Sequence, residues 1–142
     1  MTILESILKE IDRDSQLDET RLDFELLRIP QIHSRYLNQY TRQSIALRRL
    51  QGEYDTLKKS RSHFFLGKAS DEEYAQERND VKVLKTDLDM YLSADPKMIA
   101  KSTELLEQKL VVETIEKFLN SLRQRGFELR TAVDYIKFKA GA

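Results

Sequence analysis

The sequence of 142 residues contains no cysteine, two prolines and four glycines. Without cysteine the chain forms no disulfide and uses no thiolate chemistry. So few turn-forming residues exclude a many-stranded sandwich or barrel, which needs a turn about every 8–12 residues. The only two histidines, His33 and His63, are 30 positions apart, so a histidine-based metal site is not expected.

Long apolar runs are also absent. No stretch free of Asp, Glu, Lys and Arg exceeds six residues, whereas a transmembrane helix needs about 20 mostly apolar residues. The first residues carry Glu5, Lys9 and Glu10 among the aliphatic side chains, which does not fit the apolar segment of a signal peptide. We therefore expect a soluble, cytoplasmic and mostly helical protein.

Apolar residues recur at helical spacing through most of the chain, and no segment shows the sustained alternation of a strand. The pattern predicts helices over residues 2–13, 31–65, 70–91, 96–125 and 128 onward, with a short helical piece over 21–28. Pro30 is expected to open the long helix, because proline is tolerated in a first turn and disfavours helix at the residue before it. The conformation of residues 14–30 stays open.

Capping residues set the expected helix ends. Gly67 and Gly126 are predicted to stop helices, Ser70 begins an S-x-x-E capping box, and Asp95-Pro96 is a typical helix start. The predicted fold class is all-α, with one long basic helix and several shorter amphipathic helices.

The formal net charge is zero, but the charge is segregated along the chain. Its segments are residues 1–30 with net −4, 31–68 with +6, 69–95 with −5 and 96–142 with +3. Two interpretations stay open. The acidic and basic helices pair within the fold or between subunits, or the basic helix binds a polyanion while the acidic segments contact a basic protein.

Residues 58–68 combine four positive charges with two adjacent phenylalanines. Single-stranded nucleic acid is bound by this combination, because cations neutralise phosphates and aromatic faces stack on unpaired bases. Phe64 continues the apolar stripe and is expected in the core. The candidate DNA-binding residues are Lys58, Lys59, Arg61, Phe65 and Lys68.

Arg61 also has an unusual place in the helical pattern. At 100° per residue it falls inside the apolar arc, between Leu57 and Phe64. A cation at such a position must be paired, be exposed by an opening in the packing, or contact a ligand.

The sequence holds no H-E-x-x-H motif, nucleophile elbow, P-loop or Rossmann fingerprint. The acidic clusters around Asp12 and Asp71 lack EF-hand spacing and fit helix ends. We therefore expect no enzyme, no cofactor and no bound metal.

The segment K-S-R at 59–61, F-F at 64–65 and G-K at 67–68 resembles a stretch of the UvsY family, the recombination mediators of tailed phages. Further elements resemble the family in the same order: Tyr36-Leu37-Asn38, Leu92-Ser93-Ala94-Asp95, Arg125-Gly126-Phe127 and Phe138-Lys139-Ala140-Gly141. The resemblance covers nearly the whole chain and is firmest over residues 33–142.

This resemblance implies a non-enzymatic protein that binds single-stranded DNA, weakens the hold of the single-strand-binding protein and loads a RecA-like recombinase of the UvsX type. Such proteins act in recombination and in recombination-dependent replication and repair, here in the cytoplasm of the infected bacterial host. They form ring-like homo-oligomers of the hexamer or heptamer type. The family's DNA binding is attributed to the Lys and Arg of the K-x-R motif, which match Lys59 and Arg61.

The resemblance also suggests a division of the chain into an N-terminal helical DNA-binding region, residues 1–92, and a C-terminal oligomerisation region, residues 93–142. The expected oligomer contacts are Leu106, Leu110, Ile115, Phe118, Leu119, Leu122, Phe127, Val133 and Ile136. Two alternatives remain open, a helical scaffold or interaction protein that does not bind DNA, and an architectural binder of duplex DNA. The adjacent pair Phe64-Phe65 argues against the duplex binder.

Overall fold

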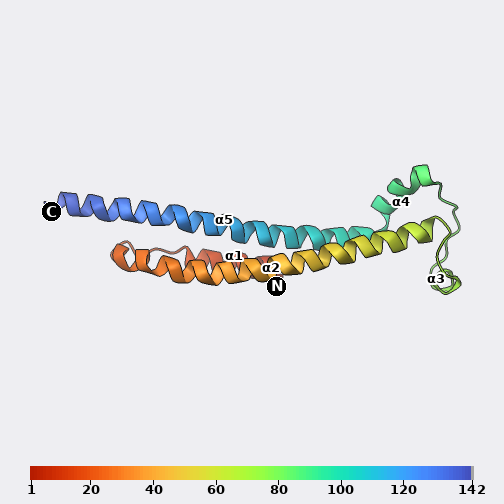
Figure 1. The fold of residues 1–142 in the computed structure, drawn as a ribbon, viewed down its shortest axis with the longest axis horizontal. Helices are drawn as coiled ribbons and strands as arrows, with labels where there is room; N and C mark the ends of the chain where they lie inside the picture. Colours follow the sequence, from red (N-terminus) through yellow and green to blue (C-terminus); the bar gives the residue numbers. More distant parts are fainter. Residues whose placement is uncertain (142) are drawn as a thin grey trace. The chain divides into compact units, whose positions relative to one another are not determined.

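A computed structural model of the protein describes residues 1–141, which contain helices and no strand. The all-α prediction is confirmed. The elements in chain order are α1 (Ile3–Asp14), α2 (Leu22–Phe65), α3 (Asp71–Gln76), the 3₁₀ helix η1 (Lys85–Asp87), α4 (Leu88–Ala94) and α5 (Pro96–Lys139) (Figure 1). The two long helices, α2 and α5, have 44 residues each.

The chain forms two compact units, residues 1–45 with 108–142 and residues 46–107. Both α2 and α5 contribute one part to each unit. This structural division differs from the functional regions 1–92 and 93–142, which stay a prediction.

Helix α1 begins at a capping box, matching the predicted helix over 2–13 to within a residue. The Thr2 hydroxyl accepts a hydrogen bond from the Glu5 amide at 3.1 Å, and the Thr2 amide donates to Glu5 Oε2 at 3.1 Å. Two N–H groups that the first turn leaves without helical partners are thereby satisfied.

The core of the first unit joins α1, α2 and α5. Its buried residues are Ile7, Ile32, Tyr36, Val111, Ile115, Phe118 and Leu122. The Tyr36 and Phe118 rings meet edge to face with centroids 4.6 Å apart. Burying one such side chain contributes about 1.5–3 kcal/mol. Three of the expected oligomer contacts, Ile115, Phe118 and Leu122, therefore belong to the chain's own core.

The prediction that Pro30 opens the long helix is wrong. Helix α2 begins at Leu22 and contains Pro30 in its interior, although an interior proline costs about 3 kcal/mol. Packing on both sides of the proline outweighs this cost. Glu25 and Ile32 are buried, and Arg28 donates to the Asp14 and Gln16 carbonyls at 3.3 and 3.2 Å.

The predicted break at Gly126 is also wrong, because α5 runs without interruption to Lys139. Leu122 and Leu129, seven residues apart and therefore on one helix face, are both buried and hold the helix on either side of the glycine. A Cβ added to Gly126 would meet Ile29 Cδ1 at 3.9 Å, an ordinary contact. The glycine here is part of a helix interior and not a cap.

In the second unit, α2 ends at Phe65 and Gly67 follows with φ +78°, so the predicted stop at Gly67 is confirmed. The buried apolar residues of this unit are Phe64, Val83, Leu92, Met98 and Leu105. Helix α5 begins at Pro96, as the Asp95-Pro96 pair predicts.

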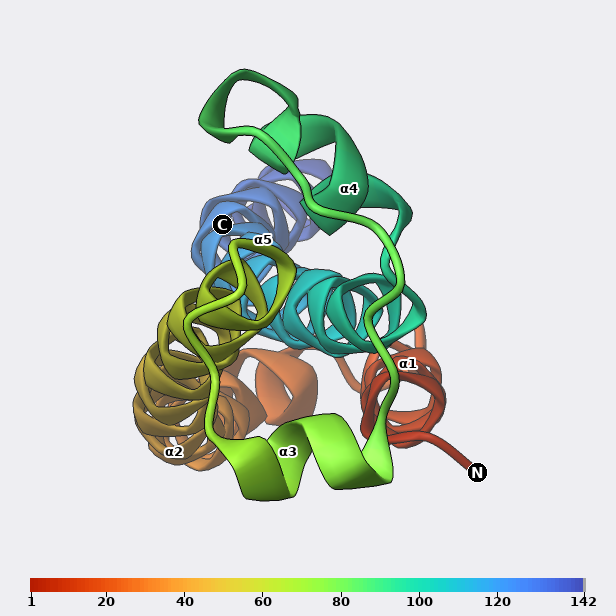
Figure 2. The ribbon, with the colours of Figure 1, turned by 90° about the vertical axis from the view of Figure 1, so that its right-hand side faces the viewer.

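The predicted helix over 70–91 is much shorter in the structure. Ser70 accepts from the Glu73 amide as expected, but α3 ends at Gln76 and residues 77–84 are irregular. Glu77 takes an extended conformation and pairs with Arg61, while Asn79 donates to the Phe64 carbonyl at 3.1 Å. These contacts with α2 stabilise the extended conformation after Gln76 more than continuation of α3 would. Helices α3 and α4 lie on opposite sides of the end of α2 (Figures 1 and 2).

Among residues 1–141, no helix is both long enough and apolar enough to cross a membrane.

Candidate nucleic-acid interface

Lys59 and Lys68 line one groove at the end of α2. Its volume is about 290 Å³, and its lining residues are Thr56, Lys59, Ser60, His63, Lys68, Ala69, Ser70 and Glu73. The local backbone brings the two lysines together. Gly67 adopts the left-handed conformation that glycine accepts without strain, and the Lys68 amide then donates to the His63 carbonyl at 2.8 Å. We call this feature the Lys59–Lys68 groove.

The Lys59–Lys68 groove has the chemistry of a phosphate site. Both lysines are exposed, so each offers an ammonium group that a phosphate can reach. Hydroxyl groups of Thr56, Ser60 and Ser70 line the same groove and can donate hydrogen bonds to phosphate oxygens. No cluster of three or more potential metal ligands occurs in the part of the chain that the structure describes.

Lys58 lies on a different side of α2 from its neighbour Lys59. It lines a separate groove of about 350 Å³, whose other residues are Tyr54, Asp89, Leu92, Ser93, Met98, Ile99 and Ser102. Successive helical residues are about 100° apart around the axis, and here this rotation directs Lys58 and Lys59 to different grooves. Each of the two grooves also has one acidic lining residue, which lowers the positive potential. Asp89 accompanies the single lysine Lys58, whereas Glu73 accompanies both Lys59 and Lys68.

Arg61 is buried and paired with two carboxylates. Its Nε donates to Asp95 Oδ2 at 2.9 Å, its Nη2 to Asp95 Oδ1 at 3.1 Å and its Nη1 to Glu77 Oε2 at 2.6 Å. Burial acts to lower the pKa of Arg61, but the hydrogen bonds that it donates to Asp95 and Glu77 outweigh burial and raise the pKa. Of the three possibilities open to a cation in the apolar arc, the structure therefore shows pairing.

The Phe65 ring packs inside the second unit. It is half-buried, with its centroid 5.4 Å from that of Phe64 and 5.8 Å from that of Tyr91. The Arg61 guanidinium carbon also lies 5.1 Å from the Phe65 centroid. Of the five candidate DNA-binding residues, Lys59 and Lys68 thus share one groove, Lys58 lies apart, and Arg61 and Phe65 make contacts within the fold.

Sequence reasoning did not identify Asp95 and Glu77 as the partners of Arg61. The signal for a partner was present, because Arg61 falls in the apolar arc of the helix. The sequence alone does not show which carboxylates pair with Arg61. Glu77 and Asp95 are brought to it by the path of residues 66–95, of which residues 77–84 are irregular. Arg48 and Arg49, two further exposed cations of α2, were counted in the charge of the basic helix but not singled out.

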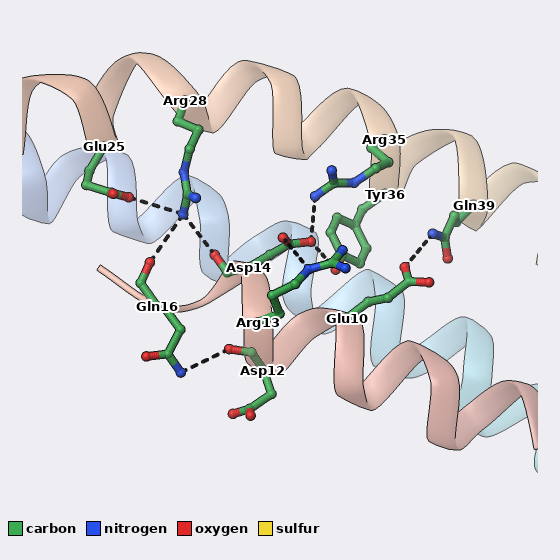
Figure 3. A network of polar contacts seen from close by, with 10 residues as sticks. All are labelled: Glu10, Asp12, Arg13, Asp14, Gln16, Glu25, Arg28, Arg35, Tyr36 and Gln39. Carbon is green, nitrogen blue, oxygen red and sulfur yellow. Dashed lines mark hydrogen bonds and ion pairs between the residues drawn. The ribbon is translucent and has the colours of Figure 1, made fainter. Parts of the chain in front are cut away.

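A second polar network joins the acidic α1 to the basic α2 (Figure 3). Asp14, which is buried, accepts from Arg35 and from the Tyr36 hydroxyl, and Gln39 donates to Glu10 at 2.9 Å. Burial acts to raise the pKa of Asp14, but the Tyr36 bond and the positive charge of Arg35 outweigh it and lower the pKa. Some of the acidic residues of α1 and the basic residues of α2 therefore pair with each other within the fold.

The other expected oligomer contacts differ in exposure. Leu119 and Val133 are half-buried, and the exposed ones are Leu106, Leu110, Phe127 and Ile136. Tyr135 and Phe138 are exposed as well, so the last turns of α5 carry apolar side chains that the chain itself does not cover. We call Tyr135, Ile136 and Phe138 the α5 end patch.

Comparison with known proteins fits this arrangement. The family model for "Recombination, repair and ssDNA binding protein UvsY" matches residues 10–142. The chain belongs to the UvsY family. It is 24 % identical over 138 residues to the recombination protein UvsY of Enterobacteria phage T4, with 97 % of this chain and 98 % of that protein covered.

The fold is that of the solved T4 mediator. Superposition on the crystal structure of the bacteriophage T4 recombination mediator protein UvsY in lattice type II gives a TM-score of 0.87, with 21 % identity and 99 % of both chains covered. The lattice type I structure gives a TM-score of 0.83, also with 21 % identity, over 94 % of this chain and 98 % of that one. The resemblance to the UvsY family is confirmed, and the family's description is recombination, repair and single-stranded DNA binding.

Proposed function

We propose that this UvsY-family chain is a non-enzymatic recombination mediator. It binds single-stranded DNA and loads a RecA-like recombinase of the UvsX type onto DNA covered by single-strand-binding protein. It acts in the cytoplasm of the infected bacterial host, in recombination and in recombination-dependent replication and repair. The observation that carries this proposal is the Lys59–Lys68 groove, where two exposed ammonium groups lie among hydroxyl donors.

Self-assembly turns one weak site into a strong one. The α5 end patch is exposed in the single chain, and a second copy of the chain would cover it in a ring of the hexamer or heptamer type. Each ring then repeats the Lys59–Lys68 groove once per subunit. Linked sites raise the effective concentration of neighbouring phosphates, so overall affinity exceeds that of one groove.

A mediator of this kind needs no chemical step and no cofactor. It has to bind the DNA conformation that favours the recombinase more tightly than the conformation held by the single-strand-binding protein. The difference between these two affinities shifts the equilibrium toward recombinase loading. The proposal therefore requires DNA, the recombinase and the single-strand-binding protein as partners.

The test is a titration with labelled single-stranded and duplex oligonucleotides over a series of salt concentrations. Each phosphate contact contributes about 0.7 to the log–log salt slope for single strands. We expect steeply salt-dependent binding that prefers the single strand, and a flatter slope in Lys59→Ala with Lys68→Ala. Lys109→Ala with Lys117→Ala, two exposed lysines of α5, is the matched control with the same charge change.

The alternative of a helical scaffold that does not bind DNA is favoured by one observation, the pairing of acidic and basic residues inside the chain, as in Arg35 with Asp14. Negligible binding to either oligonucleotide at about 50 mM salt, where phosphate contacts are strong, would overturn the mediator proposal and support the scaffold. If the groove variant and its control lost the same affinity for single-stranded DNA, the Lys59–Lys68 groove would not be the DNA site.

A further inference from the structure

Arg61 is the most enclosed cation of the K-S-R segment. Only 7 % of the residue is exposed, and its partner Asp95 is 4 % exposed. Asp95 binds the guanidinium with both carboxylate oxygens, a forked geometry that fixes direction as well as distance. The guanidinium carbon also lies 4.4 Å from the Phe64 ring centroid. Two carboxylates and two aromatic faces thus surround this cation.

A phosphate of DNA would meet repulsion at this position. The small exposed edge of Arg61 lines a groove of about 440 Å³ that also contains Glu73 and Glu77. Reaching the guanidinium would require a phosphate to approach these carboxylates and displace one of them. Lys97, which lies 3.4 Å from Glu77, further holds that carboxylate in place.

Arg61 and its two partners come from three separate parts of the chain. Arg61 is on the last turns of α2, Glu77 is the first residue after α3, and Asp95 directly precedes α5. Tyr74 of α3 reinforces the arrangement, since its hydroxyl donates to the Phe64 carbonyl at 2.8 Å and accepts from the Ala69 amide at 3.2 Å. The buried cation therefore fixes where the chain lies between α2 and α5.

Lys68 lies in the segment between α2 and α5, directly before Ala69, whose amide donates to the Tyr74 hydroxyl. The turn at Gly67 brings Lys68 beside Lys59, and the chain after Gly67 holds that turn in place through this bond from Ala69 to Tyr74. We propose that Arg61 is a positioning residue that acts through Asp95 and Glu77 to hold residues 66–95, and thereby places Lys68 beside Lys59, without itself contacting DNA. This inference rests on the proposed function. It divides the K-x-R motif into a DNA-contacting lysine and an arginine that orders the site.

The two possible roles of Arg61 predict opposite effects for Asp95→Asn. This substitution removes a negative charge and keeps the side-chain shape. If Arg61 contacted DNA, freeing its guanidinium would tighten binding. In the positioning role Asp95→Asn weakens binding to single-stranded DNA by roughly tenfold, as Arg61→Met does, and the double variant is no weaker than the weaker single variant. Asp71→Asn, at an exposed acid of α3, is the control for the charge change.

Arg61→Lys provides a second way to distinguish a DNA contact from a positioning role of Arg61. A lysine keeps the positive charge, so a phosphate contact would be largely retained. It cannot form the forked pair with Asp95, so the positioning role predicts affinity close to that of Arg61→Met. Where Arg61→Met fails to fold, Asp95→Asn and Glu77→Gln carry the same comparison, because both keep the arginine and remove only one of its partners.

A measurement without DNA separates this inference from the proposed function. Amide hydrogen exchange in residues 66–94 is expected to rise in Arg61→Met, Asp95→Asn and Glu77→Gln, while helix content by circular dichroism is retained. If the unmodified protein does not bind DNA, the proposed function fails but the exchange result still tests the positioning. Unchanged exchange, or tighter DNA binding in Asp95→Asn, would overturn the inference.

Discussion

The Tyr36 hydroxyl donates a hydrogen bond to Asp14 Oδ2 at 2.7 Å and so links α2 to the last residue of α1. Both residues are buried, and Arg35 binds the same carboxylate oxygen. Burial and the hydrogen bond to Asp14 raise the pKa of the Tyr36 hydroxyl, so it stays protonated as a donor at neutral pH. Together with the Arg35–Asp14 and Gln39–Glu10 contacts, this bond joins the acidic first helix to the basic second one.

Removing this hydroxyl should destabilise the first unit. Tyr36→Phe leaves a buried carboxylate with one donor fewer, and hydrogen bonds to charged groups contribute about 1.5–3 kcal/mol. We expect the free energy of unfolding in urea to fall by this amount. Tyr40→Phe is the matched control, since Tyr40 packs against the same core and makes no side-chain hydrogen bond within residues 1–141. An equal loss in both variants would contradict the assignment.

Acid should weaken the same contact. The pKa of Asp14 is lowered in the folded chain, so the folded state binds its proton less readily than the unfolded state does. Its contribution to stability is present above the unfolded pKa and is lost as pH falls through the lower folded value. We expect the free energy of unfolding to fall with acid more steeply in the natural protein than in Asp14→Asn. If the free energy of unfolding fell equally with acid in both proteins, protonation of Asp14 would not be the cause of the loss.

Two glycines should respond in opposite directions to alanine. Gly126 lies inside α5 with ordinary space for a Cβ, so Gly126→Ala should raise the free energy of unfolding by about 0.5–1 kcal/mol. Gly67 has φ +78°, where a Cβ costs about 1–2 kcal/mol, so Gly67→Ala should lower it. Urea unfolding of the two variants beside the natural protein measures both changes. A loss of stability in Gly126→Ala would indicate that the helix needs the glycine.

The α5 end patch should control assembly. Ile136 is exposed in the single chain, so Ile136→Asp removes no contact from the core and should leave the chain folded. If copies of the chain cover this patch, a charge placed there is buried without a partner and opposes association. We expect a smaller particle by sedimentation, with unchanged helix content. Thr131→Asp, an exposed position of the same helix, should keep the natural particle mass.

The helix ends that depend on local chemistry were predictable from the sequence. Gly67 and the Asp95-Pro96 pair mark real ends, because a left-handed cap and a proline-led first turn need only neighbouring residues. The sequence predicts a helix start at Pro30 and a helix end at Gly126, because local propensity disfavours both residues within a helix. In the structure, burial of flanking residues such as Ile32 and Leu129 outweighs that propensity.

The candidate site was predictable in residue types but not in arrangement. The basic and aromatic composition of residues 58–68 predicts a site at the end of α2. It could not separate Lys59, which lines the groove with Lys68, from Lys58, which lines another. That separation depends on where residues 66–95 run, and their course follows from contacts between residues far apart in the sequence, such as Arg61 and Asp95.

The Arg61–Asp95 pair spans 34 positions of the sequence. It holds together the two ends of the segment that connects α2 to α5. Closure entropy grows slowly with length, by about 0.6 kcal/mol for each doubling of a flexible loop. Asp80, Val81 and Lys82 are exposed within the irregular part of this segment. A peptide or fluorophore inserted there would lengthen a loop whose ends are already held, which makes this position a practical site for labelling the protein.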